Sequence, residues 1–243
     1  MTTHDTHDGP QSRAWPRQLR LPGQAAAPEG PIDMQTMYLM HHGFRRDLDA
    51  FAAAVRATPA DDRRAWRALA DRWELFAAVL HKHHTAEDEH IWPALTALGA
   101  PEDVAVLEAM EAEHGEIDPL LDSCAAGLRR LAERTDEDAR AALVVRVCAA
   151  RESLRRHLAH EETEAIAIVQ RLVTVERWHE LEAEIEKGGS LTEVARIVPW
   201  IGHGVPREAL DRVFASAPAL LKVIWLVTHR RFARREARTF RHA

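Results

Sequence analysis

Cysteine is scarce in this chain, and two other kinds of signal are missing with it. The two cysteines, Cys124 and Cys148, are far apart and form no Cys-x-x-Cys pair, so the sequence predicts neither a disulfide framework nor a thiolate zinc site. The N-terminus lacks the apolar run of a signal peptide, and no stretch of about eighteen uncharged apolar residues occurs. We therefore expect a cytoplasmic protein that does not cross a membrane.

Aromatic residues that favour strands are also few, with one Tyr and six Phe among 243 residues. Glycine and proline gather in a few places and do not recur at the short intervals typical of sheet proteins. Hydrophobic residues make up 46% of the chain and charged residues 29%, which allows a sizeable core under a solvated surface. The composition favours an all-α protein.

Charge is unevenly distributed along the chain. The formal net charge is −6, but the segment from Arg207 to the end has nine Lys or Arg and three Asp or Glu, which leaves residues 1–206 at about −12. The last segment therefore differs electrostatically from the rest of the chain.

Hydrophobic periodicity divides the chain into three parts. Residues 1–31 show no pattern, and we expect a flexible arm. Residues 32–173 contain four helical stretches, near 32–58, 61–98, 101–134 and 136–173, and the connections between them are short. Short connections make neighbouring helices antiparallel, so this part is predicted to be an up-down-up-down four-helix bundle. Residues 174–243 are predicted to be a small, basic helical extension, with a helix opening at Ser190, a loop at 199–204 and a final helix over 219–240.

Each of the four predicted bundle helices has a histidine on its apolar stripe: His41, His83, His114 and His157. Glu87 and Glu161 follow two of them by four residues, which places each carboxylate one turn away on the same face. With alternating helix directions and a rise of about 1.5 Å per residue, all of these side chains fall at a similar level of the bundle. Unpaired polar groups in a core cost about 1–3 kcal/mol each, so this arrangement predicts bound metal.

The donor types favour two ions of iron, with manganese as the other candidate, because imidazole suits iron and carboxylates bridge two cations. A structural zinc site closes with about four ligands, fewer than this core offers. Asp118, one turn after His114, is a further candidate ligand. Glu164 shares the stripe of His157, and His160 lies beside that stripe in a supporting position. Four residues lie off the main stripes and are expected at the surface or behind the ligands: His42, His84, Asp88 and His90.

Four short motifs contain these positions: MHHGFRRDL at 40–48, HHTAED at 83–88, EHGEI at 113–117 and HLAHEE at 157–162. With them, residues 36–170 resemble the hemerythrin-like, or HHE cation-binding, domain family. The resemblance implies a non-heme diiron centre in which Glu87 and Glu161 bridge the irons. Oxygen-carrying members have a histidine at the position of Asp118. A carboxylate there argues against reversible oxygen carriage and favours redox reactions with O₂, peroxide or nitric oxide, in detoxification or sensing.

Two other functions stay open at this stage. A diiron oxygenase or oxidase would need a substrate cavity beside the metals, for which Trp66, Trp73 and Trp92 are candidate lining residues if they do not simply fill the core. A metal-storage or interaction module would bind metal without turnover. The sequence identifies no catalytic residue.

The basic extension is expected to pack on the acidic body of the protein. Peripheral contact with an anionic membrane is a less favoured alternative, and nucleic-acid binding is not expected because no reading motif accompanies the charge. A similar Pro-Trp and arginine-rich pattern follows the domain in some bacterial members of the family that the chain resembles.

Overall fold

The computed structural model describes residues 15–187 and 190–243, and the ordered elements among them are all helical. The elements, in chain order, are α1 (Gln35–Ala57), α2 (Arg63–Ala86), η1 (Glu87–Ile91), α3 (Trp92–Thr96), α4 (Pro101–Glu133), α5 (Glu137–His160), η2 (Glu161–Ala165), α6 (Ile166–Leu172), α7 (Val175–Ile185), α8 (Leu191–Gly202), α9 (Arg207–Ser216) and α10 (Ala219–Thr239).

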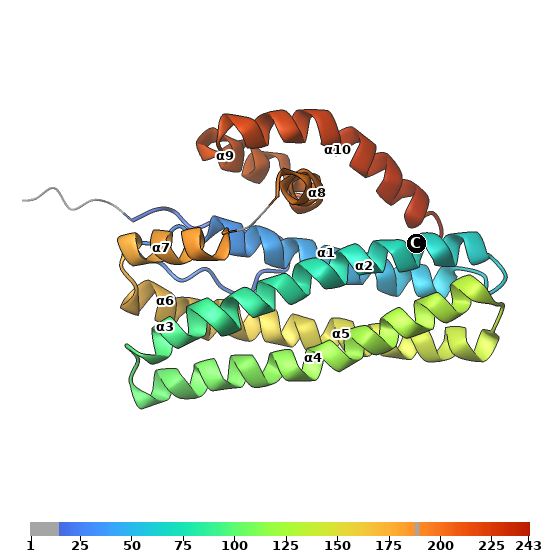
Figure 1. The fold of residues 1–243 in the computed structure, drawn as a ribbon, viewed down its shortest axis with the longest axis horizontal. Coiled ribbons are helices and arrows are strands. Elements are labelled where there is room, and N and C mark those ends of the chain that lie inside the picture. The colour runs from blue at the N-terminus through green and yellow to red at the C-terminus, as the bar shows by residue number, and fades with distance from the viewer. Residues whose placement is uncertain (1–14, 188–189) are drawn as a thin grey trace, which may run out of the picture.

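Four antiparallel rods form the bundle: α1, the continuous run α2–η1–α3, α4, and the continuous run α5–η2–α6 (Figure 1). Local sequence sets where they start and stop. The side chain of Asp62 accepts a hydrogen bond from the Ala65 N–H, and that of Asp136 accepts one from the Ala139 N–H. Pro101 lies in the first turn of α4, where its missing N–H costs nothing. The predicted all-α fold with a packed helical bundle is confirmed.

Two apolar cores fill the bundle, one toward each end. The first includes Phe44, Leu80, Ile117 and Leu154, and the second includes their counterparts on the other side of the histidines: Leu39, Ile91, Met110 and Ala165. In each rod, most buried apolar residues on one side of the candidate histidine pack in the first core, and those on the other side pack in the second. The polar side chains form a layer between the cores, as the alternating helix directions predict.

Two wide π turns interrupt the rods, and each begins at a candidate carboxylate. In η1 the Trp92 N–H donates to the Glu87 carbonyl, and in η2 the Ile166 N–H donates to the Glu161 carbonyl. A π turn holds one residue more than an α turn and often marks a functional site. Pro93 lies two residues after the end of η1, and in a regular helix its ring would crowd the carbonyl of Glu89, four residues earlier. The wide turn relieves that contact.

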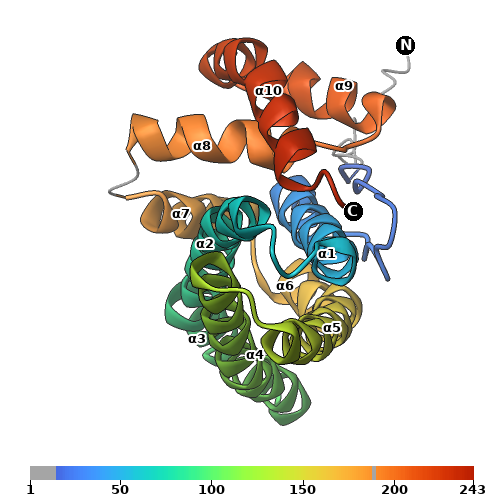
Figure 2. The same ribbon diagram turned by 90° about the vertical axis from the view of Figure 1, so that its right-hand side faces the viewer.

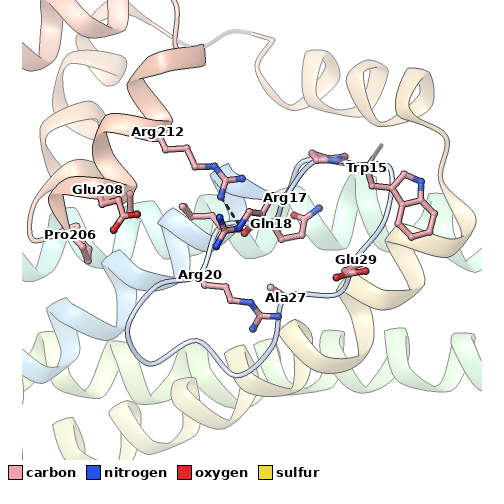
Figure 3. Close-up of a pocket in the computed structure, with 12 residues that line it drawn as sticks. Trp15, Arg17, Gln18, Arg20, Ala27, Glu29, Pro206, Glu208 and Arg212 are labelled. Atoms are coloured by element: carbon pink, nitrogen blue, oxygen red, sulfur yellow. Dashed lines mark hydrogen bonds between the residues drawn. The ribbon is translucent and has the colours of Figure 1, made fainter. Parts of the chain in front are cut away.

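The segment 15–31 packs against the bundle, which differs from the flexible arm predicted over 1–31; residues 1–14 lie outside the described residues. Leu19 and Leu21 are buried, and the Gln18 side chain bonds the Ile32 carbonyl at 2.8 Å and the Met34 N–H at 3.2 Å. Figure 3 shows this segment beside α9, where Arg212 donates to the Gln18 carbonyl. Side-chain bonds to the backbone hold this stretch, and they leave no periodic pattern in the sequence.

Helices α7 to α10 lie along one side of the bundle, over α1 and α2 (Figure 2). Ser190 caps α8, as predicted, by accepting a hydrogen bond from the Glu193 N–H. The loop predicted at 199–204 is wrong for its first part, because α8 continues through Pro199 and Trp200 to Gly202. Trp200 is fully buried against the bundle, which keeps this last turn helical.

A buried network of charged groups joins the extension to the bundle. Arg72 of α2 donates to Asp47 of α1 at 2.6 Å and to Glu236 of α10 at 2.8 Å. The indole of Trp200 in α8 donates to the same Asp47 carboxylate at 2.7 Å. Two bundle helices and two helices of the extension therefore meet at two carboxylates and one guanidinium.

The final helix exposes apolar and basic groups together. Its apolar half leaves several large side chains exposed: Leu220, Val223, Leu226 and Val227. In the part of the chain that the structure describes, no helix is both long enough and apolar enough to cross a membrane.

Candidate metal centre

The four predicted histidines meet in the layer between the two cores. His41 comes from α1, His83 from α2, His114 from α4 and His157 from α5, and their side chains are at most 8% exposed. Their donor atoms divide into two groups, and within each group the atoms lie within 4.8 Å of one another: His84, His114 and His157; His41, His83, Glu87 and Glu161.

His84 is the ligand candidate that sequence reasoning missed. It lies off the stripe of His83, but α2 has two neighbours in the bundle, and adjacent positions point to different ones. The His83 ring lies 5.4 Å from that of His41 in α1, whereas the His84 ring stacks on His114 of α4 with centroids 3.9 Å apart. The buried HH pair at 83–84 was the available signal: a helix that touches two neighbours turns more than one stripe inward.

Glu87 and Glu161 connect the two groups. Glu87 Oε1 lies 3.1 Å from His83 Nε2, and its Oε2 lies 3.6 Å from His114 Nε2 in the other group. Glu161 Oε2 lies 3.1 Å from His41 Nε2 and 3.8 Å from His157 Nε2. Each carboxylate therefore reaches imidazoles of both groups, which is the position that a bridging ligand needs.

Many of the nitrogen and oxygen atoms that these side chains could offer to a metal ion are buried and have no hydrogen-bond partner. The short contacts of His41 with Glu161 and of His83 with Glu87 do not have the direction of hydrogen bonds. The unpaired buried atoms of the two groups are His41 Nε2, His83 Nε2, both ring nitrogens of His84, and both carboxylate oxygens of Glu87 and of Glu161. Unpaired buried polar atoms are rare and costly, and bound cations would satisfy one nitrogen of each imidazole together with the carboxylate oxygens. The residues present fit a metal centre.

A second set of carboxylates lies behind the histidines. Glu162 accepts from His41 Nδ1 at 2.9 Å, Asp88 from His114 Nδ1 at 2.8 Å, and Glu113 from His157 Nδ1 at 2.8 Å. When Nδ1 donates its proton in this way, Nε2 is left with its lone pair facing the interior. Three of the five imidazoles are thus held with Nε2 toward the interior, which is the orientation that metal binding requires.

Charges in the layer shift the pKa values of its members in opposite directions. Burial lowers the pKa of His83 to about 3, with the neighbouring His41 adding to the effect. Burial would also lower the pKa of His41, but Glu161 and Glu162 outweigh it and raise the value to about 9. Burial and the nearby Glu161 raise the pKa of Glu87 well above its usual range. Two carboxylates this close in a buried layer need either a proton on one of them or a cation between them.

The comparisons with known proteins agree with this geometry. The model of the hemerythrin HHE cation-binding domain matches residues 33–169, more than half of the chain. The chain belongs to the hemerythrin HHE cation-binding family. No curated protein and no solved structure was found to match. The matched range contains both groups of donors and ends before α7, so the extension lies outside the hemerythrin domain.

Two of the predicted site residues lie outside the two donor groups of this hemerythrin domain. Asp118 is half-exposed, because Ile117 takes the inward position on that turn of α4 with no exposure. Glu164 is 56% exposed at its side chain. The π turn η2 adds a residue after Glu161, so Ala165 faces the core at the level where a regular helix would place Glu164.

His160, predicted in a supporting position, shares a carboxylate with a ligand candidate. Its Nδ1 donates to Glu113 Oε1 at 2.8 Å, while Glu113 Oε2 accepts from His157. Glu162 adds a second support that the sequence analysis did not single out. It is fully buried, and it binds both Arg45 and the Ala25 N–H in addition to His41.

A cavity of about 590 Å³ reaches the layer of histidines and carboxylates in the hemerythrin domain, which we call the metal layer, from the side of the extension. His83 and Glu87 form part of its wall. The side chain of His83 is 8% exposed, more than those of His41, His114 and His157. Trp66, Trp73 and Trp92, which the sequence left as either lining or core residues, are buried in the two apolar cores. A larger cavity of about 790 Å³, between the N-terminal segment and α9, contains none of the ligand candidates (Figure 3).

Proposed function

We propose that the bundle holds two iron ions and reacts with O₂, peroxide or nitric oxide, in redox detoxification or sensing. The supporting observation is the set of unpaired donor atoms on buried side chains in two connected groups. His84, His114 and His157 would hold one ion, and His41 and His83 the other, with Glu87 and Glu161 shared. Manganese is the other metal that these donors suit.

Five imidazoles and two carboxylates are a donor set of intermediate hardness, which favours iron over zinc. Bound iron would supply electron exchange with a small oxidant such as O₂, peroxide or nitric oxide. The chain's own contribution is positioning: the carboxylates of Glu162, Asp88 and Glu113 fix three rings, and the apolar cores exclude water on both sides.

Tyr38 is the one tyrosine of the chain, and its hydroxyl is buried without a hydrogen-bond partner. Burial, together with the negative charge of Glu162, raises the pKa of this hydroxyl. Tyrosine is protonated at neutral pH even at its ordinary pKa, and the upward shift moves it further from ionisation, so Tyr38 contributes no further anion to the layer.

The sequence argued against reversible oxygen carriage because Asp118 was a candidate ligand in place of a histidine, and the geometry of the site does not support that argument. Asp118 lies outside both groups, and His84 supplies the fifth imidazole. The donor set is therefore compatible with reversible carriage as well as with redox turnover, and the reaction must be distinguished by spectroscopy.

A second candidate, a diiron oxygenase or oxidase acting on a small organic substrate, is favoured by one specific observation. The cavity at His83 and Glu87 has the size of a small-molecule site, which is about 300–1,000 Å³. Turnover of an organic substrate would require such a space beside the metal.

An anaerobic iron titration, followed by optical and Mössbauer spectra with O₂, peroxide and nitric oxide, tests the proposal. We expect two irons per chain and a spectral change with at least one oxidant. A band that appears in air and reverses when oxygen is removed would indicate carriage, and consumption of peroxide would indicate redox turnover. A purified chain that holds only traces of iron or manganese would refute the proposal.

Single variants test the bridging assignment in the same titration. Glu87→Ala and Glu161→Ala should each release at least one ion, because each carboxylate reaches both groups. Glu164→Ala is the matched control: Glu164 lies in the same π turn as Glu161 but is exposed. Retention of two ions by both bridging variants would contradict the assignment.

A further inference from the structure

The cavity beside the metal layer has an apolar interior and a defined inner end. Its walls come from α1, α2, η1, α7 and α8. The apolar lining includes Met37, Met40, Val79, Ile91, Trp178 and Ile197. Methionine side chains adapt to the shape of a bound molecule, and an indole offers a flat apolar surface. His83 and Glu87, two candidate ligands of one ion, form part of the same wall.

The outer wall belongs to this chain's extension. Trp178, Ile185 and Ile197 come from α7 and α8, beyond residue 169 where the family match ends. The buried contacts of Trp200 hold α8 in place over α1. The bundle alone would leave His83 beside an open surface, whereas the extension closes that surface into a cavity.

The charges around the cavity disfavour an anionic occupant. Lys82 is paired with Glu193 at 2.5 Å, so its charge is compensated. Among the described lining residues, two further carboxylates, Glu182 and Glu186, then outnumber the one remaining cation, Arg196. An anion entering this cavity would meet more carboxylates than cations, whereas a neutral apolar molecule would lose little on leaving water.

We propose that this cavity binds a neutral, largely apolar organic molecule, with its inner end against His83 and Glu87. The binding itself follows from the cavity, and its role as a substrate site rests on the proposed metal function. The extension would then determine which organic molecules come near the metal centre.

Two fluorescent probes that differ by one sulfonate test the proposal. N-phenyl-1-naphthylamine is neutral, and 8-anilino-1-naphthalenesulfonate is the same ring system with a negative charge. Titration of the full chain, with its metal content measured on the same sample, should show one site for the neutral probe and a weaker affinity, about tenfold or more, for the anionic one.

Blocking variants locate the site. Ala78 and Thr36 are exposed residues at the cavity, on α2 and α1, so tryptophan at either position narrows the opening without entering a core. Ala78→Trp and Thr36→Trp should each weaken the neutral probe about tenfold or more. Ala53→Trp, at an exposed position of α1 away from the cavity, is the control and should bind like the unchanged chain.

The outcomes separate this proposal from the metal function. Loss of probe binding in both blocking variants, with metal content kept, supports the cavity site. Probe binding that both blocking variants leave unchanged, or equal affinity for the two probes, would overturn the proposal. A chain that binds the neutral probe in this cavity but holds no metal would refute the metal function and leave the binding site supported.

Discussion

Replacement of Gly43 by alanine tests how firmly the extension is docked on the bundle. A Cβ atom at Gly43 would lie 2.8 Å from Cη2 and 2.9 Å from Cζ2 of Trp200. The indole has little freedom to move, since it is fully buried, donates to Asp47 at 2.7 Å, and packs on Phe44 with ring centroids 5.4 Å apart. The added methyl group must therefore displace part of α8.

The magnitude follows from two opposing effects. Alanine in a helix interior is about 1 kcal/mol more favourable than glycine, whereas overpacking a filled core costs about 1–3 kcal/mol. Gly43→Ala should therefore change the free energy of unfolding by between about zero and a loss of about 2 kcal/mol. Gly115→Ala is the matched control: it lies within α4, and a Cβ there meets nothing within 4 Å, so it should stabilise by about 1 kcal/mol.

Urea unfolding of the metal-free chain, followed by far-UV circular dichroism, measures both variants, and limited proteolysis reports whether α8 has loosened. We expect Gly43→Ala to be less stable than Gly115→Ala by about 1–3 kcal/mol and to be cut faster in the extension. Equal stabilisation by the two substitutions would show that Trp200 does not pack on Gly43, and the docking described above would be wrong.

Three further perturbations test the metal centre and the buried charges. His84→Ala should lower the iron content of the loaded chain while Asp118→Ala leaves it unchanged, as measured by elemental analysis; the reverse result would restore Asp118 as a ligand. Glu162→Gln should weaken metal binding about 10–100-fold, because the carboxylate orients His41. It should also destabilise the fold by about 3 kcal/mol, because Arg45 loses its buried charged partner. A metal titration and a urea unfolding curve that match those of the unchanged chain would contradict this. Burial alone would raise the pKa of Asp47, but neighbouring arginines hold this pKa below its usual range. The stability that the Asp47 carboxylate contributes is therefore present above about pH 4 and is lost as the pH falls. Asp47→Asn should flatten the fall of the urea midpoint between about pH 7 and pH 3, and an unchanged slope would count against the network.

The bundle and most of its ligand candidates were predictable because they follow one regular rule. Apolar residues at helical spacing define the inward face, and His41, His83, His114 and His157 occupy that face in four successive helices. Antiparallel order then brings them to one level without further information.

The remaining parts of the site depend on departures from that rule. His84 faces inward because α2 contacts two neighbours, and Glu164 faces outward because η2 contains an extra residue. Neither the second neighbour nor the wide turn is visible in the spacing of apolar residues. The docking of the extension depends on Arg72 and Asp47, charged residues that the sequence pattern assigns to a surface.

The wide turn η2 also determines how the chain should respond when one residue is deleted there. Because η2 holds one residue more than a regular turn, deletion of a single exposed residue such as Thr163 would let α5 and α6 join as one continuous α-helix. Because the deletion removes the residue that the wide turn accommodates, the residues after it would keep their faces, and Ala165 would still face the core as part of a regular helix. The spacing from His157 to Glu161 would stay intact. The two wide turns therefore each accommodate one extra residue between the candidate metal ligands and the apolar part of the rod that closes the bundle.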